Sequence, residues 1–144
     1  MFHVTIATTE KELEDAFSIR KKVFVEEQGV PISLELDEHD KTASHFIVYT
    51  ENMPIGAGRL RETDVGTGKV ERVCVLPEYR GRHLGNLVMN ALETHAKEKK
   101  LQKIVLNSQS YAVPFYEKLG YVITSPEFMD ADIPHRAMEK KVDL

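Results

Sequence analysis

The sequence has a single cysteine among its 144 residues, so no disulfide can form within the chain. A lone thiol suits a reducing compartment, and we expect a cytoplasmic protein. No apolar run approaches the roughly 18 residues that a membrane span needs, and the first residues lack the regions of a signal peptide. Repeats and low-complexity segments are missing as well. These absences favour one globular domain over residues 1–144, with no membrane partner.

The charge balance is slightly acidic, with a formal net charge of -4. This excess argues against a general nucleic-acid binder. The composition, 42% hydrophobic and 29% charged, is that of an ordinary globular protein. Its histidines show no metal-ligand spacing, so no metal site is predicted. They are His3, His39, His45, His83, His95 and His135.

Hydrophobic periodicity predicts a mixed α/β domain. Thr9 and Glu12 form a capping-box pattern that opens the first helix. The strand–helix–strand order over 70–107 favours a parallel pair of strands. The glycine-containing segment 65–69 lacks phosphate-loop spacing and is interpreted as a hairpin turn. We expect strands over 2–7, 43–50, 55–63, 70–76, 103–107, 121–124 and 136–142, helices over 9–25, 84–99 and 111–119, and a short helix or ordered loop over 32–41.

The most informative stretch is the strand–turn–helix from Val70 to Gly85. Free backbone N–H groups at the start of a helix, together with the helix dipole, attract anions. Gly81 and Gly85 allow close approach of the backbone, and Arg80 and Arg82 add positive charge. This arrangement predicts a site for a ligand that bears phosphate.

The turn reads Arg80-Gly81-Arg82-His83-Leu84-Gly85, and a second pattern, Ala-Val-Pro-Phe-Tyr-Glu-Lys-Leu-Gly-Tyr, occupies 112–121. Together they resemble the acyl-CoA-binding motif and the later Phe-Tyr element of the GNAT superfamily of N-acetyltransferases. His83 stands where that family's pattern has its middle glycine. The expected element order, β-α-β-β-β-α-β-α-β-β, is also similar. The resemblance implies the GNAT fold, with a splayed central pair of strands.

Two N-terminal stretches indicate which branch of the GNAT superfamily the sequence resembles. The segment 20–28, Arg-Lys-Lys-Val-Phe-Val-Glu-Glu-Gln, and the acidic segment 35–40 resemble the ElaA-like acetyltransferases. The Arg-x-x-Val-Phe-Val part is also similar to the acyl-homoserine-lactone synthases, which share the fold. By this resemblance Arg20, Phe24, Glu27 and Gln28 border the acceptor pocket, although core packing is an alternative for Phe24.

The resemblance implies acetyl-CoA as co-substrate and direct transfer of its acetyl group to a primary amine in a ternary complex. A backbone N–H aimed at the developing oxyanion stabilises it electrostatically. The coenzyme-binding residues implied are Val73, Cys74, Val75, Arg80, Gly81, Arg82, His83, Leu84, Gly85, Asn86 and Asn107. For Cys74, a small buried strand residue is preferred to a covalent nucleophile.

Two residues are candidates for proton transfer. Glu71 is expected on the same strand face as Val73 and Val75, either as the base or as an exposed carboxylate beside Arg72. Tyr116 either protonates the leaving thiolate or packs beneath the coenzyme. The sequence leaves three further hypotheses: a CoA-binding regulatory module without turnover, an acyl-CoA-dependent synthase related to the acyl-homoserine-lactone synthases, and a nucleotide-binding protein. A homodimer is possible, and the acceptor's identity is open.

Overall fold

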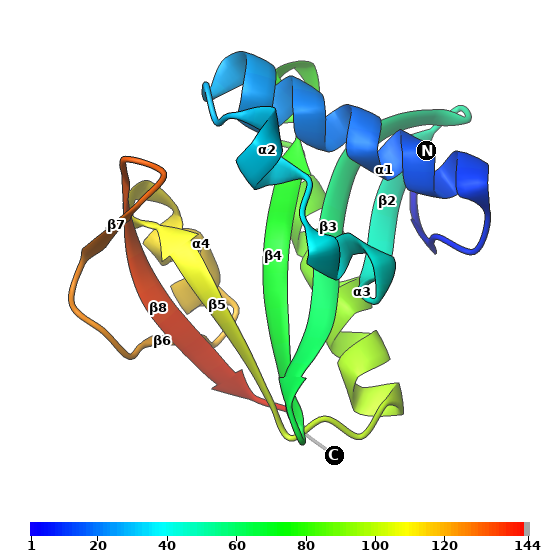
Figure 1. Cartoon of the computed structure of the whole chain (residues 1–144). Coiled ribbons are helices and arrows are strands. Elements are labelled where there is room, and N and C mark those ends of the chain that lie inside the picture. The colour runs from blue at the N-terminus through cyan, green and yellow to red at the C-terminus, as the bar shows by residue number, and fades with distance from the viewer. Residues whose placement is uncertain (143–144) are drawn as a thin grey trace.

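The computed structural model describes residues 1–142, which form one eight-stranded sheet in the order β1-β2-β3-β4-β5-β8-β6, with β7 beside β8 (Figure 1). β4 and β5 are parallel, and the other neighbouring pairs are antiparallel. The predicted mixed α/β GNAT fold is confirmed. The strands are β1 (Phe2–Ile6), β2 (Ser44–Thr50), β3 (Met53–Asp64), β4 (Thr67–Val75), β5 (Lys103–Gln109), β6 (Val122–Ile123), β7 (Phe128–Asp130) and β8 (Ile133–Lys141).

Helices cover both faces of the sheet. In Figure 1, α1 and α2 lie in front of the strands, while α3 and α4 lie behind them. No helix within residues 1–142 is both long and apolar enough to cross a membrane. The helices are α1 (Glu10–Arg20), α2 (Ile32–Glu35), α3 (Leu84–Glu98) and α4 (Val113–Lys118), with a π-helical segment η1 (Lys21–Glu27) and the 3-10 turns η2 (Glu38–Lys41), η3 (Pro77–Tyr79) and η4 (Ser110–Ala112).

The core lies between the sheet and α3. A Cβ atom at Gly58 of β3 would stand 2.7 Å from Val88 Cγ1, so this glycine lets α3 approach the sheet closely. The predicted apolar stripe of α3 is largely confirmed, although Leu87 is exposed. The buried side chains of the helix are Leu84, Val88, Met89, Leu92 and Ala96.

The first helix starts as predicted, because Thr9 and Glu12 form a complete capping box. The prediction of one α-helix to residue 25 is wrong, because the hydrogen-bond pattern widens after Arg20 into η1. Gln28 N donates to Val23 O at 3.0 Å, five residues earlier. Such π-helical turns occur often at functional sites.

The central pair of strands separates along its length. β4 and β5 pair only from Thr67–Lys103 to Val70–Leu106. Beyond Val70, β4 continues to Val75 without β5, while β5 pairs with β8 along its whole length. Backbone groups at the open ends of the two strands are therefore available to a ligand, as expected for a splayed pair.

A bulge at Arg72 changes which way β4 presents its side chains. Arg72 has a left-handed backbone with φ +61°, and the register with β3 shifts between Ala57 and Arg59. Glu71 therefore bonds to Arg59, whereas Val73 Cγ2 lies 3.6 Å from the Cβ position of Gly58, beside α3. The expectation that Glu71 and Val73 share one strand face is wrong.

The C-terminal strands form a hairpin that sequence analysis missed. β7 pairs with the start of β8 through Asp130 and Ile133, and the turn residues Ala131 and Asp132 both have positive φ. A type I′ hairpin needs this geometry, which glycine or asparagine usually supplies. By contrast, the hairpin predicted over 65–69 is confirmed, with its turn at Val65 and Gly66 between β3 and β4.

Candidate active site

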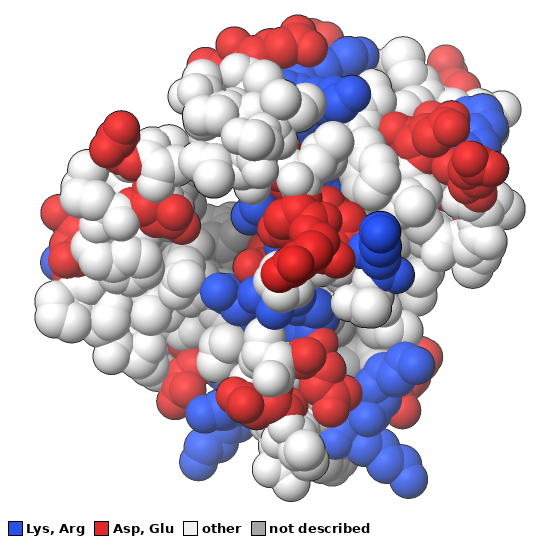
Figure 2. Space-filling view, viewed as in Figure 1, with Lys and Arg blue, Asp and Glu red and all other residues white. Residues whose placement is uncertain are grey.

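A cavity of about 720 Å³ fills the space where β4 and β5 diverge. In Figure 2 it is the hollow between the β5–β8 half of the molecule, at the left, and β4 with α2 in the middle. Segments η1 and α2 close one side, and η4, α4 and the β7–β8 hairpin close the other. Its volume is in the range of small-molecule pockets.

The basic turn beside the cavity has the backbone of an anion site. Gly81 has φ +82° and His83, the N-cap of α3, has φ +61°. His83 therefore has a left-handed backbone, which residues other than glycine adopt uncommonly. Leu84, Gly85 and Asn86 open the helix, where backbone N–H groups have no acceptor one turn earlier.

Fewer side chains of the turn face the cavity than the sequence predicted. Leu84 is buried in the core, so only its backbone is available to a ligand. A Cβ atom at Gly85 would stand 3.0 Å from Phe115 Cζ, so this glycine makes room for the aromatic ring of α4. Arg82 lies over the ring of Tyr79 at 5.4 Å. Of the residues from 80 to 86, Arg80 alone is among those lining the cavity.

Arg80 connects the turn to the opposite side of the cavity. Its guanidinium donates to both carboxylate oxygens of Glu27, at 2.6 and 2.7 Å, and its Nε donates to Val75 O at 3.0 Å. Hydrogen bonds from Arg80 outweigh desolvation and lower the pKa of Glu27. Glu27 was expected to border the acceptor pocket, but it instead holds a donor-side arginine.

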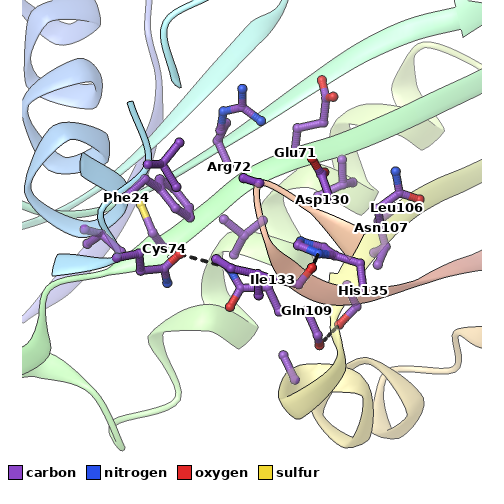
Figure 3. Close-up of a pocket in the computed structure, with 18 of the residues that line it drawn as sticks. Phe24, Glu71, Arg72, Cys74, Leu106, Asn107, Gln109, Asp130, Ile133 and His135 are labelled. Carbon is purple, nitrogen blue, oxygen red and sulfur yellow. Dashed lines mark hydrogen bonds between the residues drawn. The ribbon is translucent and has the colours of Figure 1, made fainter. Parts of the chain in front are cut away.

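The predicted coenzyme-binding strand residues are brought together. Val73, Cys74 and Val75 of β4 and Asn107 of β5 all line the cavity (Figure 3). Burial raises the pKa of the Cys74 thiol to about 12, so it is protonated at neutral pH. A protonated thiol is a poor nucleophile, in agreement with the preference for a small buried residue there.

Glu71 also lines the cavity, but arginines hold it. Arg61 Nε donates to its Oε1 at 2.7 Å, and Arg59 Nη2 donates to the same atom at 2.8 Å. Burial raises the pKa of the Glu71 carboxyl, but these hydrogen bonds outweigh it and leave the pKa below its usual value. A carboxylate stabilised in this way is a weak base, so the geometry favours Glu71 as a fixed negative charge.

The arginine that organises this cluster was missed by sequence analysis. Arg59 is fully buried, and its Nη1 donates to Asp37 at 2.8 Å and to Asp40 at 2.7 Å. Within residues 1–142 its Nε is the one buried side-chain nitrogen or oxygen without a hydrogen-bond partner. Only its position beside Gly58 in a strand full of small residues hinted at a packed site.

Arg20 supports the site from beneath. Its side chain has no exposed surface, and it donates to Glu35 and to Asp40 at 2.7 Å each. These bonds, with those from Arg59, lower the pKa of Asp40 to about 2 despite its burial. Arg20 was expected to border the acceptor pocket, but Glu35 and Asp40 occupy its guanidinium and it is not among the residues lining the cavity.

Phe24 and Gln28, both from η1, do line the cavity. Phe24 also packs against the core, and its place at an acceptor pocket stays a prediction. Gln109 Nε2 donates to Gln28 Oε1 at 3.0 Å and links η1 to the end of β5. No local sequence pattern predicts this link, because the partners are 81 residues apart.

Tyr116 of α4 lines the cavity beside Phe115, with ring centroids 4.9 Å apart. No hydrogen bond of its hydroxyl to another residue is found within residues 1–142. Burial raises the pKa of the phenol, so the hydroxyl carries its proton at neutral pH. A protonated hydroxyl without a partner at the cavity wall can donate a hydrogen bond to a molecule in the cavity.

Comparison with known proteins identifies the family. A sequence model described as an acetyltransferase (GNAT) domain matches residues 6–142. The uncharacterized N-acetyltransferase YjcF of Bacillus subtilis is 47% identical over 136 residues, covering 94% of this chain and 96% of the relative. The UPF0039 protein C11D3.02c of Schizosaccharomyces pombe is 36% identical over 137 residues, covering 93% and 89%. The chain therefore belongs to the GNAT acetyltransferase family.

Solved structures agree on the architecture. An acyl-CoA N-acyltransferase from Pseudomonas aeruginosa is 26% identical and superposes with a TM-score of 0.87, covering 97% of this chain and 99% of that one. ElaA from Escherichia coli is 23% identical with a TM-score of 0.88 and the same coverage. The likeness to ElaA shows the fold alone.

Proposed function

We propose that the protein is an acetyl-CoA-dependent N-acetyltransferase that transfers the acetyl group directly to a primary amine. The observation that carries the proposal is the cavity between β4 and β5, which connects the turn at Arg80 with Tyr116. Both motifs of the family meet there, and the donor and the acceptor can be present together.

The residues divide the chemistry between them. The open backbone of β4 around Val73–Val75 offers N–H groups to the thioester arm and to the oxyanion that develops on its carbonyl. A C–N bond forms from the neutral amine as the C–S bond breaks, and the nitrogen releases one proton to solvent as it becomes the amide. Tyr116 gives its proton to the departing thiolate, and solvent restores the tyrosine. The protonated thiol of Cys74 supports direct transfer over an acyl-enzyme.

Fixed negative charge supports an amine acceptor. Glu71 stays ionised because of its arginine neighbours, and Asp130 adds a second carboxylate at the β7–β8 hairpin. An ammonium ion is drawn towards such groups before it loses its proton. We also propose a cytosolic location, because a single thiol suits a reducing compartment. A homodimer is proposed because GNAT domains often dimerise.

A panel assay tests the function. The full chain is mixed with acetyl-CoA and benzylamine, spermidine, free lysine or a lysine-containing peptide, and both thiol release and acetylated product are measured. We expect amine-dependent thiol release with at least one acceptor. Binding of acetyl-CoA without turnover of any amine would favour the regulatory module, and absence of acetyl-CoA binding would refute both.

The alternative of an acyl-homoserine-lactone synthase receives no separate support. The solved structure of the acyl-homoserine-lactone synthase LasI superposes with a TM-score of 0.83, but it is only 14% identical. At that identity the likeness shows the fold alone. Longer acyl-CoA donors in the same assay would reveal a preference for larger acyl groups.

A further inference from the structure

One histidine of the cavity has no part in the mechanism so far. His135 lies on β8, is 8% exposed and lines the cavity on the side facing β4. Figure 3 shows it beside Ile133, across the cavity from Cys74 and Phe24. Its ring stacks on Phe128 of β7, with centroids 6.0 Å apart and planes 24° from parallel, which fixes its orientation.

The hydrogen bonds of His135 determine which nitrogen carries the proton. Nδ1 is 2.6 Å from the carbonyl oxygen of Ile133. A carbonyl oxygen can only accept, so Nδ1 is the protonated nitrogen. Nε2 makes no hydrogen bond to any residue from 1 to 142, nor is it a buried atom without a partner. Its lone pair is therefore open to the cavity.

The charges around His135 differ from those around Glu71. Glu71 receives hydrogen bonds from two arginines, whereas no ion pair of His135 is found within residues 1–142. Of its nearest neighbours along β8 and across on β5, Pro134 and Gln109 are uncharged, and Arg136 carries a positive charge. The titratable or charged groups that share the cavity with His135 are Glu35 of α2, Lys69, Glu71, Arg72 and Cys74 of β4, Arg80 of the turn, Tyr111 and Tyr116 of η4 and α4, and Asp130 of β7.

We propose that His135 is the general base of the reaction, a role that rests on the N-acetyltransferase function proposed above. Nε2 accepts a proton from the acceptor's ammonium group, directly or through one water, and imidazolium forms. The freed amine attacks the thioester, and His135 later returns the proton to solvent. Glu71 then acts by attracting the ammonium and stabilising the imidazolium, and Tyr116 keeps its separate role as the acid.

The test uses His135→Asn in the full chain. Asparagine places an N–H where Nδ1 lies, so the bond to Ile133 O is kept while Nε2 is lost. The control is His3→Asn, because His3 lies on the edge strand β1, stacked on Tyr49 and outside the cavity. The pH dependence of kcat/KM is measured with the amine of the panel that the wild type acetylates fastest, and thermal melting confirms that each variant is folded.

We expect kcat/KM of His135→Asn to fall about 10²-fold at neutral pH, a typical contribution of a general base. The deficit should shrink as the pH approaches the amine's own pKa, about 10.4 for a lysine-like amine, because free amine then needs no base. Acetyl-CoA affinity should not change. A wild-type pH profile in His135→Asn would overturn the proposal.

A second measurement does not depend on the variant. Nitrogen-15 NMR of the wild type, with His135 assigned by its absence in His135→Asn, should show a protonated Nδ1 and an unprotonated Nε2 in the neutral ring. The opposite tautomer would overturn the role of His135 and leave the acetyltransferase intact. A wild type that acetylates no amine would refute the function, and the role with it.

Discussion

The two sides of the cavity are built on different principles. On the donor side, the turn at Arg80 and the open edge of β4 offer backbone groups, and the nearby side chains are occupied with structural contacts. On the acceptor side, fully buried Arg59 and Arg20 hold carboxylates from three segments. Backbone sites tolerate changes of side chain, whereas a buried ion network does not. The consequences of substitution should therefore differ sharply between the sides.

The largest effect is expected from Arg59→Met. Removal of one member of a buried ion network leaves its partners charged and unpaired, so the free energy of unfolding should fall by about 3–5 kcal/mol. Urea denaturation measures it. The control is Lys103→Met, whose pair with Glu139 is exposed and is worth about 0–1 kcal/mol. Equal losses in the two variants would contradict the contrast between the sides.

Tyr116→Phe should come next, with kcat lowered about 10²-fold because a proton donor is lost. The dissociation constant for acetyl-CoA, measured by calorimetry, should hardly change, because the ring remains. Tyr111→Phe serves as control, since Tyr111 also lines the cavity but is largely exposed. Full activity of Tyr116→Phe would remove the tyrosine from the mechanism.

Gly85→Ala tests how closely the donor turn packs on α4. The new methyl would lie 3.0 Å from Phe115 Cζ, and the ring must shift into the cavity wall. We expect acetyl-CoA to bind several-fold more weakly, as a calorimetric titration can show. Asn90→Ala changes an exposed position of the same helix and should leave affinity unaltered. Unchanged binding by Gly85→Ala would mean that the turn adapts freely.

The smallest effect is expected from His83→Gly, which removes a non-glycine residue from left-handed backbone. The turn then adopts its shape without strain, and acetyl-CoA should bind two- to fivefold more tightly, less than about 1 kcal/mol. Lys100→Gly is the matched control, because Lys100 has φ +60° at the other end of α3. Weaker binding by His83→Gly would show that the imidazole contributes to the donor site.

The donor side was largely predictable from sequence, because its signals are local. The turn at Gly81 and His83 and the start of α3 are set by residues within a few positions of one another, although the contact of Gly85 with Phe115 joins distant segments. The splayed strands followed from the resemblance to the GNAT family. Short, contiguous sequence motifs therefore predict binding sites that are formed by backbone N–H groups.

The acceptor side was predicted less well, because its contacts join distant segments. Arg59 meets Asp40 and Glu71 from separate elements, and Gln28 meets Gln109 across 81 residues. The bulge at Arg72 also reverses the strand alternation that a period of two predicts. No window of sequence contains these partners together, so composition and periodicity could not reveal them.

The single thiol gives the molecule a built-in probe. Cys74 is the one cysteine of the chain, and it lies in the wall of the cavity with 7% of its surface exposed. A small thiol-specific reagent can therefore modify one position only, and slowly, because the thiolate is scarce at neutral pH. A molecule that fills the space between β4 and β5 should cover that sulfur. The rate of alkylation therefore reports the fraction of the protein whose cavity is unoccupied.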